Sequence, residues 1–168
     1  MSVSTFDTTI VRNMMEDAIE FCARKTGLKD RAQILKAMRR GDCSVCEYLR
    51  YGLAKEVAKY LGLVDDTIEA IYTYEPEYAT SVDEPVPVSP GLNLIARVSR
   101  KSAALSSIVA SVGSALAEEY RELGCPKANA LCYKIDVKVA DNDEVQKRIG
   151  YGALVNSFYV RPTEVWHR

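Results

Sequence analysis

The sequence predicts an α+β protein, because helical patterns fill its first third and strand patterns dominate the rest. Apolar residues recur every three or four positions through residues 9–61, as they do on one face of a helix. From Thr67 onward, alternating apolar and polar residues include many β-branched and aromatic side chains. No helix separates the first two expected strands, which predicts a mostly antiparallel four-stranded sheet covered by one long helix.

The first third of the chain carries three helical patterns. The first begins near Thr9 and stops at Gly27, and a second, shorter pattern follows Asp30 and ends at Gly41. The third begins with a Ser-x-x-Glu arrangement at residues 44–47, in which hydroxyl and carboxylate satisfy unpaired backbone donors. We expect this third helix to end at Gly62.

Two strand patterns follow the helices and flank a proline-rich segment. Residues 67–74 alternate in polarity, and residues 92–98 place apolar side chains on one face. Between them, residues 74–91 hold four of the six prolines, which remove backbone donors and restrict the residue before each of them. This segment therefore predicts an extended loop between two strands.

The remaining elements predict one long helix and two more strands. Residues 100–123 have an apolar helical face that ends at Gly124, and residues 131–139 alternate clearly between apolar and charged side chains. A turn or short helix is expected at residues 141–149, and a last strand at residues 154–160. The whole order predicts a helical segment at residues 1–64 and a β-β-α-β-β portion at residues 65–168, packed together as one compact domain.

Charge is distributed unevenly although the net charge is only -1. Residues 24–59 carry a clear excess of Lys and Arg, whereas residues 60–90 contain seven acidic residues and neither Lys nor Arg. Such complementary blocks attract each other within a chain or between two chains. We expect the two regions to lie together, either in one copy or across a pair of copies.

Missing groups argue against most enzyme classes. The single histidine is His167, close to the end of the sequence, and chain ends are often poorly ordered. No phosphate-binding loop or dinucleotide fingerprint occurs, since Gly150-Tyr151-Gly152 precedes an expected strand and not a helix. We therefore expect no catalytic residues, no cofactor and no metal, and a protein that is not an enzyme.

Targeting signals are also missing from the sequence. Met1–Asp7 has no basic region leading into an apolar stretch, as a signal peptide would. The longest uncharged stretch, Ser102–Ala117, is shorter than the ~20 apolar residues that a membrane-spanning helix needs. We expect a cytoplasmic protein without a membrane partner, in which the five cysteines are reduced.

One cysteine pair supports an enzymatic alternative. Cys43 and Cys46 have Cys-x-x-Cys spacing, and Ser44 is the expected cap of the third helix. Cys46 then lies in the first helical turn, where the positive end of the helix dipole favours the thiolate. A thiol-disulfide oxidoreductase using Cys43 and Cys46 is the alternative hypothesis, and two ordinary small residues at a helix start are the simpler interpretation.

A second alternative is a DNA-binding regulator. Residues 28–62 include two helices joined at Gly41 and resemble the helix-turn-helix of small bacterial repressors. The resemblance implies phosphate contacts from the basic cluster and DNA affinity that falls with salt. A separate recognition helix after Gly52 is missing, so nucleic acid is not the expected partner.

The outer face of the expected sheet carries several cations and one aromatic residue. An RNA-binding surface would stack bases on aromatic side chains among such cations, but few aromatic residues lie on this face. We expect a solvated surface. The residues concerned are Arg97, Lys134, Lys138, Tyr159 and Arg161.

The leading hypothesis rests on a stripe of small residues along the long helix. Their spacing allows close approach of another backbone, either within the chain or from a second copy about a two-fold axis. Serine hydroxyls in the same stripe suit a small ligand. We therefore predict a self-associating protein, a dimer, that binds a small ligand between helix and sheet. The stripe consists of Ala103, Ser107, Ala110, Ser114 and Ala117.

Overall fold

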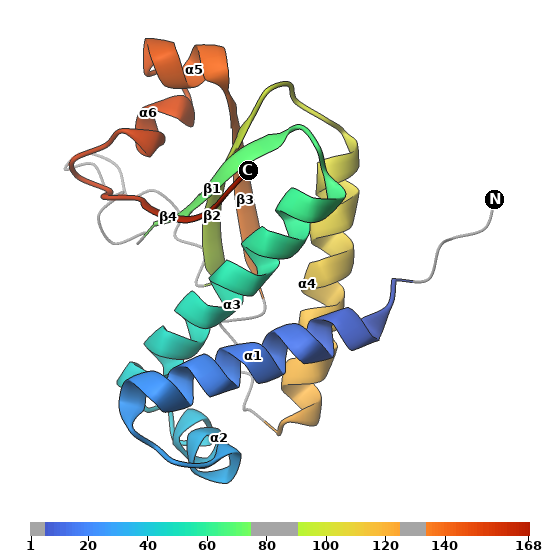
Figure 1. The fold of residues 1–168 in the computed structure, drawn as a ribbon, viewed down its shortest axis with the longest axis vertical. Coiled ribbons are helices and arrows are strands. Elements are labelled where there is room, and N and C mark those ends of the chain that lie inside the picture. The colour runs from blue at the N-terminus through green and yellow to red at the C-terminus, as the bar shows by residue number, and fades with distance from the viewer. Residues whose placement is uncertain (1–5, 75–90, 125–133) are drawn as a thin grey trace.

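The computed structural model describes residues 6–74, 91–124 and 134–168 and has an α+β fold, as predicted (Figure 1). Three helices come first, and a four-stranded sheet with further helices follows. The two parts are joined by one hydrophobic cluster, which contains side chains from the first three helices, the long helix and the sheet. The predicted helical segment and sheet portion therefore share a core.

The first two helices begin at aspartate caps. Helix α1 (Thr8–Thr26) is capped by Asp7, whose carboxylate accepts a hydrogen bond from Thr9 N, and it ends at Gly27 with φ of 70°. Helix α2 (Arg31–Arg39) is capped by Asp30, which accepts from Gln33 N at 2.7 Å. Both caps satisfy backbone donors that have no partner within the helix.

Helix α3 (Cys43–Val64) differs from its prediction at both ends. The cap is Asp42 and not Ser44, because the Asp42 carboxylate accepts from Val45 N at 3.1 Å and so starts the helix earlier. The helix also continues through Gly62, where the Trp166 ring lies against the glycine and leaves no room for a Cβ atom. Helix α3 lies between α1 and the sheet (Figure 1).

The sheet is mixed, whereas a mostly antiparallel sheet was predicted. Strands β1 (Ile68–Thr73) and β2 (Leu92–Val98) pair antiparallel, but β2 and β3 (Ile135–Asp141) are parallel. The long helix α4 (Ala104–Glu122) connects β2 to β3 and carries the chain back to the end at which β2 began. The strand order is β3-β2-β1-β4, so β3 and β4 form the two edges.

The C-terminal region departs most from the prediction. Helices α5 (Asn142–Lys147) and α6 (Gly152–Val155) precede strand β4 (Thr163–His167), so the strand expected at residues 154–160 is wrong. Strand β4 pairs antiparallel with β1, and this pairing places Trp166 beside Ile71. Pairing with β1 and packing against α3 therefore determine where the last strand lies, and local β-propensity does not. Residues 131–133 of the predicted third strand lie outside the described residues.

The core is built from aliphatic side chains of both parts. Strand β2 is almost entirely buried, and α3 contributes one apolar face along most of its length. Within the part of the chain described here, no helix is both long and apolar enough to cross a membrane. The largest fully buried side chains include Met15, Ile34, Met38, Leu49, Leu53, Leu61, Ile68, Ile71, Leu92, Leu94, Ile95 and Tyr120.

Candidate functional site

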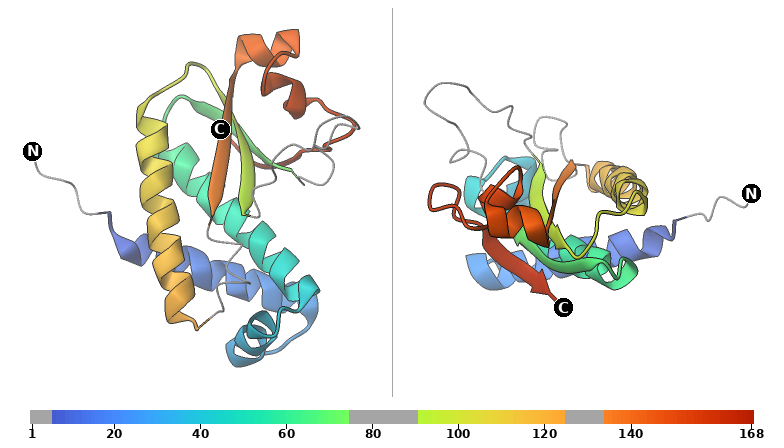
Figure 2. Two further views of the ribbon diagram at one scale, coloured as in Figure 1. Left: turned by 180° about the vertical axis from the view of Figure 1, so that it is seen from behind. Right: turned by 90° about the horizontal axis from the view of Figure 1, so that it is seen from above.

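An open groove lies between α4 and β3, which are side by side (Figure 2). Its volume is about 700 Å³. One wall is the small-residue face of α4, and the other is the core-facing side of β3 and the residues beside it. We call this feature the α4–β3 groove. It is lined by Leu105, Ser106, Val109, Ala110, Gly113, Ser114, Ala117, Lys134, Ile135, Asp136, Val137 and Val139.

Three of the five residues of the predicted stripe line this groove, namely Ala110, Ser114 and Ala117. The other two do not. Ala103 is the N-cap residue that precedes α4, and the backbone carbonyl of Ser107 accepts a hydrogen bond from the Ser111 hydroxyl. The structure thus places three of the five stripe residues toward β3 and the other two elsewhere.

The groove exists because α4 uses a different face for the core. Leu105, Val112, Leu116 and Tyr120 are buried and belong to the main hydrophobic cluster. Helix α4 also contacts α1 and α3. Most of its large apolar side chains therefore point toward these helices, and small residues together with Leu105 and Val109 cover the side next to β3.

Strand β3 presents a row of backbone groups at the edge of the sheet. Leu92 N donates to the carbonyl of Lys134 at 2.6 Å, so the backbone groups of Lys134 point toward β2. Since successive residues in a strand alternate, the N–H and C=O groups of Ile135, Val137 and Val139 point away from β2. No further strand pairs with this outer edge among the described residues.

A charged pair lies on the other face of β3, away from α4. Lys138 Nζ is 3.1 Å from the Asp136 carboxylate, and the same ammonium lies 5.3 Å from the centre of the Tyr151 ring. Burial acts to lower the pKa of Lys138, but the hydrogen bond to Asp136 and the Asp136 charge, with smaller contributions from Tyr151 and Tyr74, together outweigh it and the pKa rises. Burial, together with the nearby Asp136 charge, raises the pKa of Tyr74. The cluster brings together Tyr74 after β1, Asp136 and Lys138 of β3, and Tyr151 at the start of α6. Of these four residues, only Lys138 was predicted to lie on the outer face of the sheet.

Two other residues expected on that outer face lie elsewhere. Tyr159 is 83% exposed in the segment before β4, and Arg161 in the same segment has φ of 46°. Arg97 does lie on the face and is 3.5 Å from Glu69. Because the face carries acidic as well as basic side chains, it is not a continuous cationic surface.

The cysteine pair lies at the start of α3, as predicted. Cys46 is half-buried, and the side chain of Cys43 lies outside the described residues. No local pattern links Cys22 of α1 to the start of α3, but its thiol donates to Val45 O at 3.5 Å. Burial, and next the neighbouring Cys46, raises the pKa of Cys22 to about 11, so this thiol is protonated at neutral pH.

Whereas Cys46 lies near the start of α3, His167 lies near the C-terminal end of that helix. It lies in β4, is 72% exposed, and its Nδ1 atom is 2.9 Å from Glu164. The described residues contain no group of three or more His, Cys, Asp or Glu side chains that could hold a metal ion.

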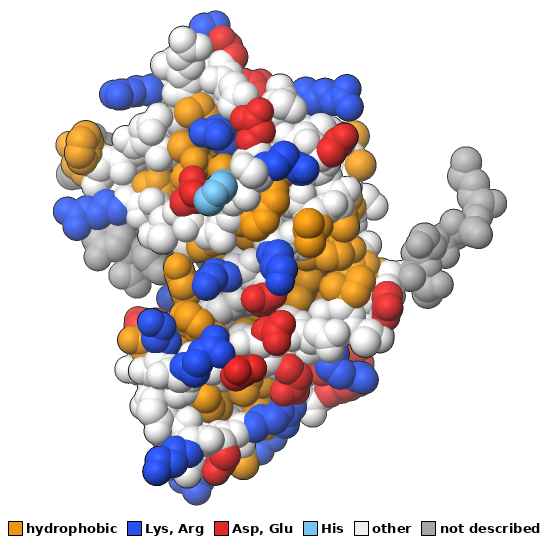
Figure 3. All heavy atoms as spheres, viewed as in Figure 1, with side chains coloured by type: hydrophobic (Ala, Val, Ile, Leu, Met, Phe, Trp, Pro, Cys, Tyr) orange, Lys and Arg blue, Asp and Glu red, His pale blue; other side chains and the backbone are white. Residues whose placement is uncertain are grey.

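The region that resembles a helix-turn-helix forms part of the core. Helix α3 packs against α1 and the sheet, and Leu49, Leu53 and Val57 are fully buried. Acidic and basic side chains are interspersed over the helices on the face seen in Figure 3. Much of the predicted acidic block falls in residues 75–90, outside the described residues, so its pairing with the basic block stays a prediction.

Comparison of the chain with protein-family models, with curated proteins and with solved structures gave no match.

Proposed function

We propose that this chain is a non-enzymatic protein that self-associates at the α4–β3 groove. The single observation that carries the proposal is an open groove of about 700 Å³ beside the outer edge of β3. Outward backbone groups on an edge strand are a template for another chain. A second copy supplies both the strand and the apolar cover that this edge lacks within the described residues.

The chemistry of the groove supports a protein partner. Ile135, Val137 and Val139 are half-buried and point into the space beside α4. Covering such side chains removes apolar surface from water, which favours association by roughly 25 cal/mol per Å² before the entropic costs. The small residues of α4 leave room for a backbone to approach. A homodimer, as predicted from the sequence, meets these conditions, because each of the two copies contributes the same surface.

Sedimentation velocity across micromolar concentrations tests this proposal. Ala110→Arg places a long cationic side chain in the groove, and we expect a shift toward monomer. Ser107→Arg is the matched control, because Ser107 is also exposed on α4 but does not line the groove. A strictly monomeric wild-type protein, or equal effects of both substitutions, would contradict the proposal.

A small ligand is the second occupant to consider, because the groove volume lies within the range of ligand pockets, roughly 300–1,000 Å³. The hydroxyls of Ser106 and Ser114 supply polar contacts along apolar walls. Native mass spectrometry of protein taken directly from cells separates the two cases. A retained small mass that Ala110→Arg removes supports the ligand, whereas a doubled chain mass supports self-association.

The two other hypotheses have less support. A thiol oxidoreductase needs a thiolate, whereas Cys22, whose thiol donates to the backbone carbonyl of Val45 beside Cys46, is protonated at neutral pH. A DNA-binding regulator needs an exposed recognition helix, and α3 buries its apolar face against α1 and the sheet. A Cys22 thiol that forms no disulfide agrees with the reducing cytoplasm that we propose as the location.

A further inference from the structure

We infer that the second copy docks by pairing its β3 antiparallel with β3 of the first copy, in a register centred on Val137. This inference rests on the proposed self-association and names its geometry. The two four-stranded sheets then form one continuous sheet through a two-fold axis perpendicular to it. The alternation of backbone groups and of charges along β3 selects this register.

The backbone alternation limits the possible registers. In an antiparallel pair, residues whose N–H and C=O groups face the partner exchange both hydrogen bonds. On the outer edge of β3 these residues are Ile135, Val137 and Val139. A register centred on Val137 places Val137 opposite its counterpart and Ile135 opposite Val139 of the second copy. Every outward group of these three residues then has a partner.

The charges distinguish this register from its neighbours. Centring on Val137 places Asp136 opposite Lys138 of the second copy, and the two-fold axis repeats that pair. These positions lie between hydrogen-bonded pairs, where facing Cα atoms are only about 4.5 Å apart. Centring on Lys138 would set two ammonium groups opposite each other, and centring on Asp136 would oppose two carboxylates. Among the registers centred on Asp136, Val137 or Lys138, only the Val137-centred one places opposite charges opposite each other.

The position of α4 is compatible with this docking. A two-fold axis perpendicular to the sheet keeps both copies of α4 on the same face, where each flanks the joined edges. Viewed from above, α4 lies beside β3 (Figure 2). The groove-lining residues Ala110, Ser114 and Ala117 are small, so the two helices can approach each other across the axis.

Charge reversal tests the register. Asp136→Lys gives a strand with lysine at both positions, and Lys138→Asp gives a strand with aspartate at both. In each variant, both cross-strand pairs become repulsive, and we expect the dimer dissociation constant to rise about tenfold or more. An equimolar mixture of the two variants restores opposite charges in the heterodimer. Native mass spectrometry resolves that heterodimer by mass.

The double variant Asp136→Lys with Lys138→Asp exchanges the charges and restores pairing within a homodimer, which also shows that the strand tolerates both substitutions. The matched controls are Asp143→Lys and Lys147→Asp on α5, where the same charges form an ion pair of 2.8 Å away from the edge. We expect the controls to associate like the wild type. A dimer that Asp136→Lys leaves intact overturns the register but retains self-association. A monomeric wild-type protein overturns both.

Discussion

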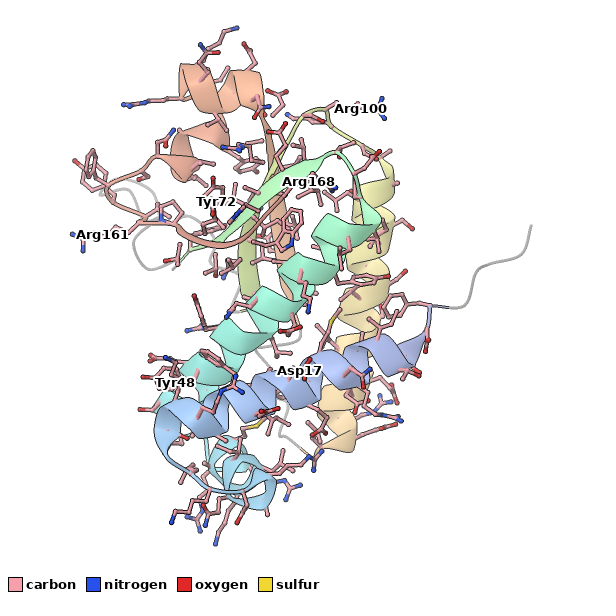
Figure 4. All side chains as sticks on the ribbon, in the orientation of Figure 1. Asp17, Tyr48, Tyr72, Arg100, Arg161 and Arg168 are labelled. Carbon is pink, nitrogen blue, oxygen red and sulfur yellow. The ribbon has the colours of Figure 1, made fainter. Side chains whose placement is uncertain are left out.

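The two edge strands of the sheet, β4 and β3, differ in the contacts that they make with the rest of the chain. At the β4 edge, the Trp166 ring packs against Gly62 of α3, and the Arg168 guanidinium donates to the carbonyl of Gly62 at 2.7 Å (Figure 4). Arg168 also donates to the carbonyls of Asp65 and Ile68. At the β3 edge, an open groove takes the place of such contacts. We call these the anchored edge and the open edge.

The difference shows how one chain can both limit and promote strand pairing. The anchored edge is a short strand of five residues, and its exposed side chains Glu164 and His167 are polar. Short, polar edge strands are poor templates for another chain. The open edge has seven residues and three aliphatic side chains toward the groove. Association is therefore expected at the open edge alone.

The largest expected effect comes from breaking the attachment of β3 to β2. A Cβ atom at Gly91 would overlap the backbone carbonyl of Lys134, which no side-chain rotation can relieve. We expect Gly91→Ala to lower the free energy of unfolding by about 3 kcal/mol. Urea unfolding followed by circular dichroism measures it. A change within about 0.5 kcal/mol, as for an ordinary surface substitution, would show that β3 is held in another way.

At the anchored edge, Gly62→Ala tests the contact with Trp166. Replacing glycine by alanine inside a helix ordinarily stabilises it by about 1 kcal/mol. Here the new methyl group would overlap the indole ring, so we expect a loss of about 2 kcal/mol instead. The sign of the change is diagnostic. Adding Trp166→Leu gives a double-mutant cycle, and the two losses should be less than additive.

A smaller effect is expected where Arg168 covers the end of α3. Its guanidinium satisfies carbonyls near the C-terminus of the helix, where positive charge is favoured. Since the side chain is exposed, we expect Arg168→Ala to cost about 1 kcal/mol in the free energy of unfolding. Arg168→Lys keeps the charge but loses the planar fork, and should recover part of that loss. Equal values for both variants would assign the contribution to the guanidinium geometry alone.

The smallest effect is expected from a charge reversal at the anchored edge. Glu164→Lys removes an exposed ion pair with His167, and exposed pairs contribute about 0–1 kcal/mol. We expect no change in the dimer dissociation constant. Asp136→Lys makes the same reversal from acid to base at the open edge and is expected to weaken association. Equal behaviour in sedimentation velocity would remove the distinction between the edges.

Sequence patterns predicted the secondary structure well where a segment is stabilised by residues close to it in the chain. The faces of α1, α2 and α4, the strands β1 and β2, and the stops at Gly27 and Gly124 follow from periodicity and from residues that end helices. The start of α3 differs from the prediction because the Asp42 carboxylate, two residues before Ser44, accepts from the Val45 backbone donor.

Partner strands, in contrast, are not encoded locally. The segment 154–160 has strand propensity but contains a helical turn and an exposed loop, whereas Thr163–His167 pairs with β1. The candidate site was found in part. The helical spacing of Ala110, Ser114 and Ala117 is visible in the sequence. The strand that faces them, β3, lies further along the chain, after the end of α4 and the segment that follows it, so a local pattern does not reveal this contact.

By itself, the sequence determined the α+β class, most helix faces and the small-residue surface of α4, because these depend on side-chain periodicity within one element. Tertiary structure alone decided that β3 runs parallel to β2, that β4 closes the opposite edge, and that α4 faces an open groove. Such pairings depend on backbone hydrogen bonds and packing between segments distant in the chain, and similar local patterns are compatible with several of them.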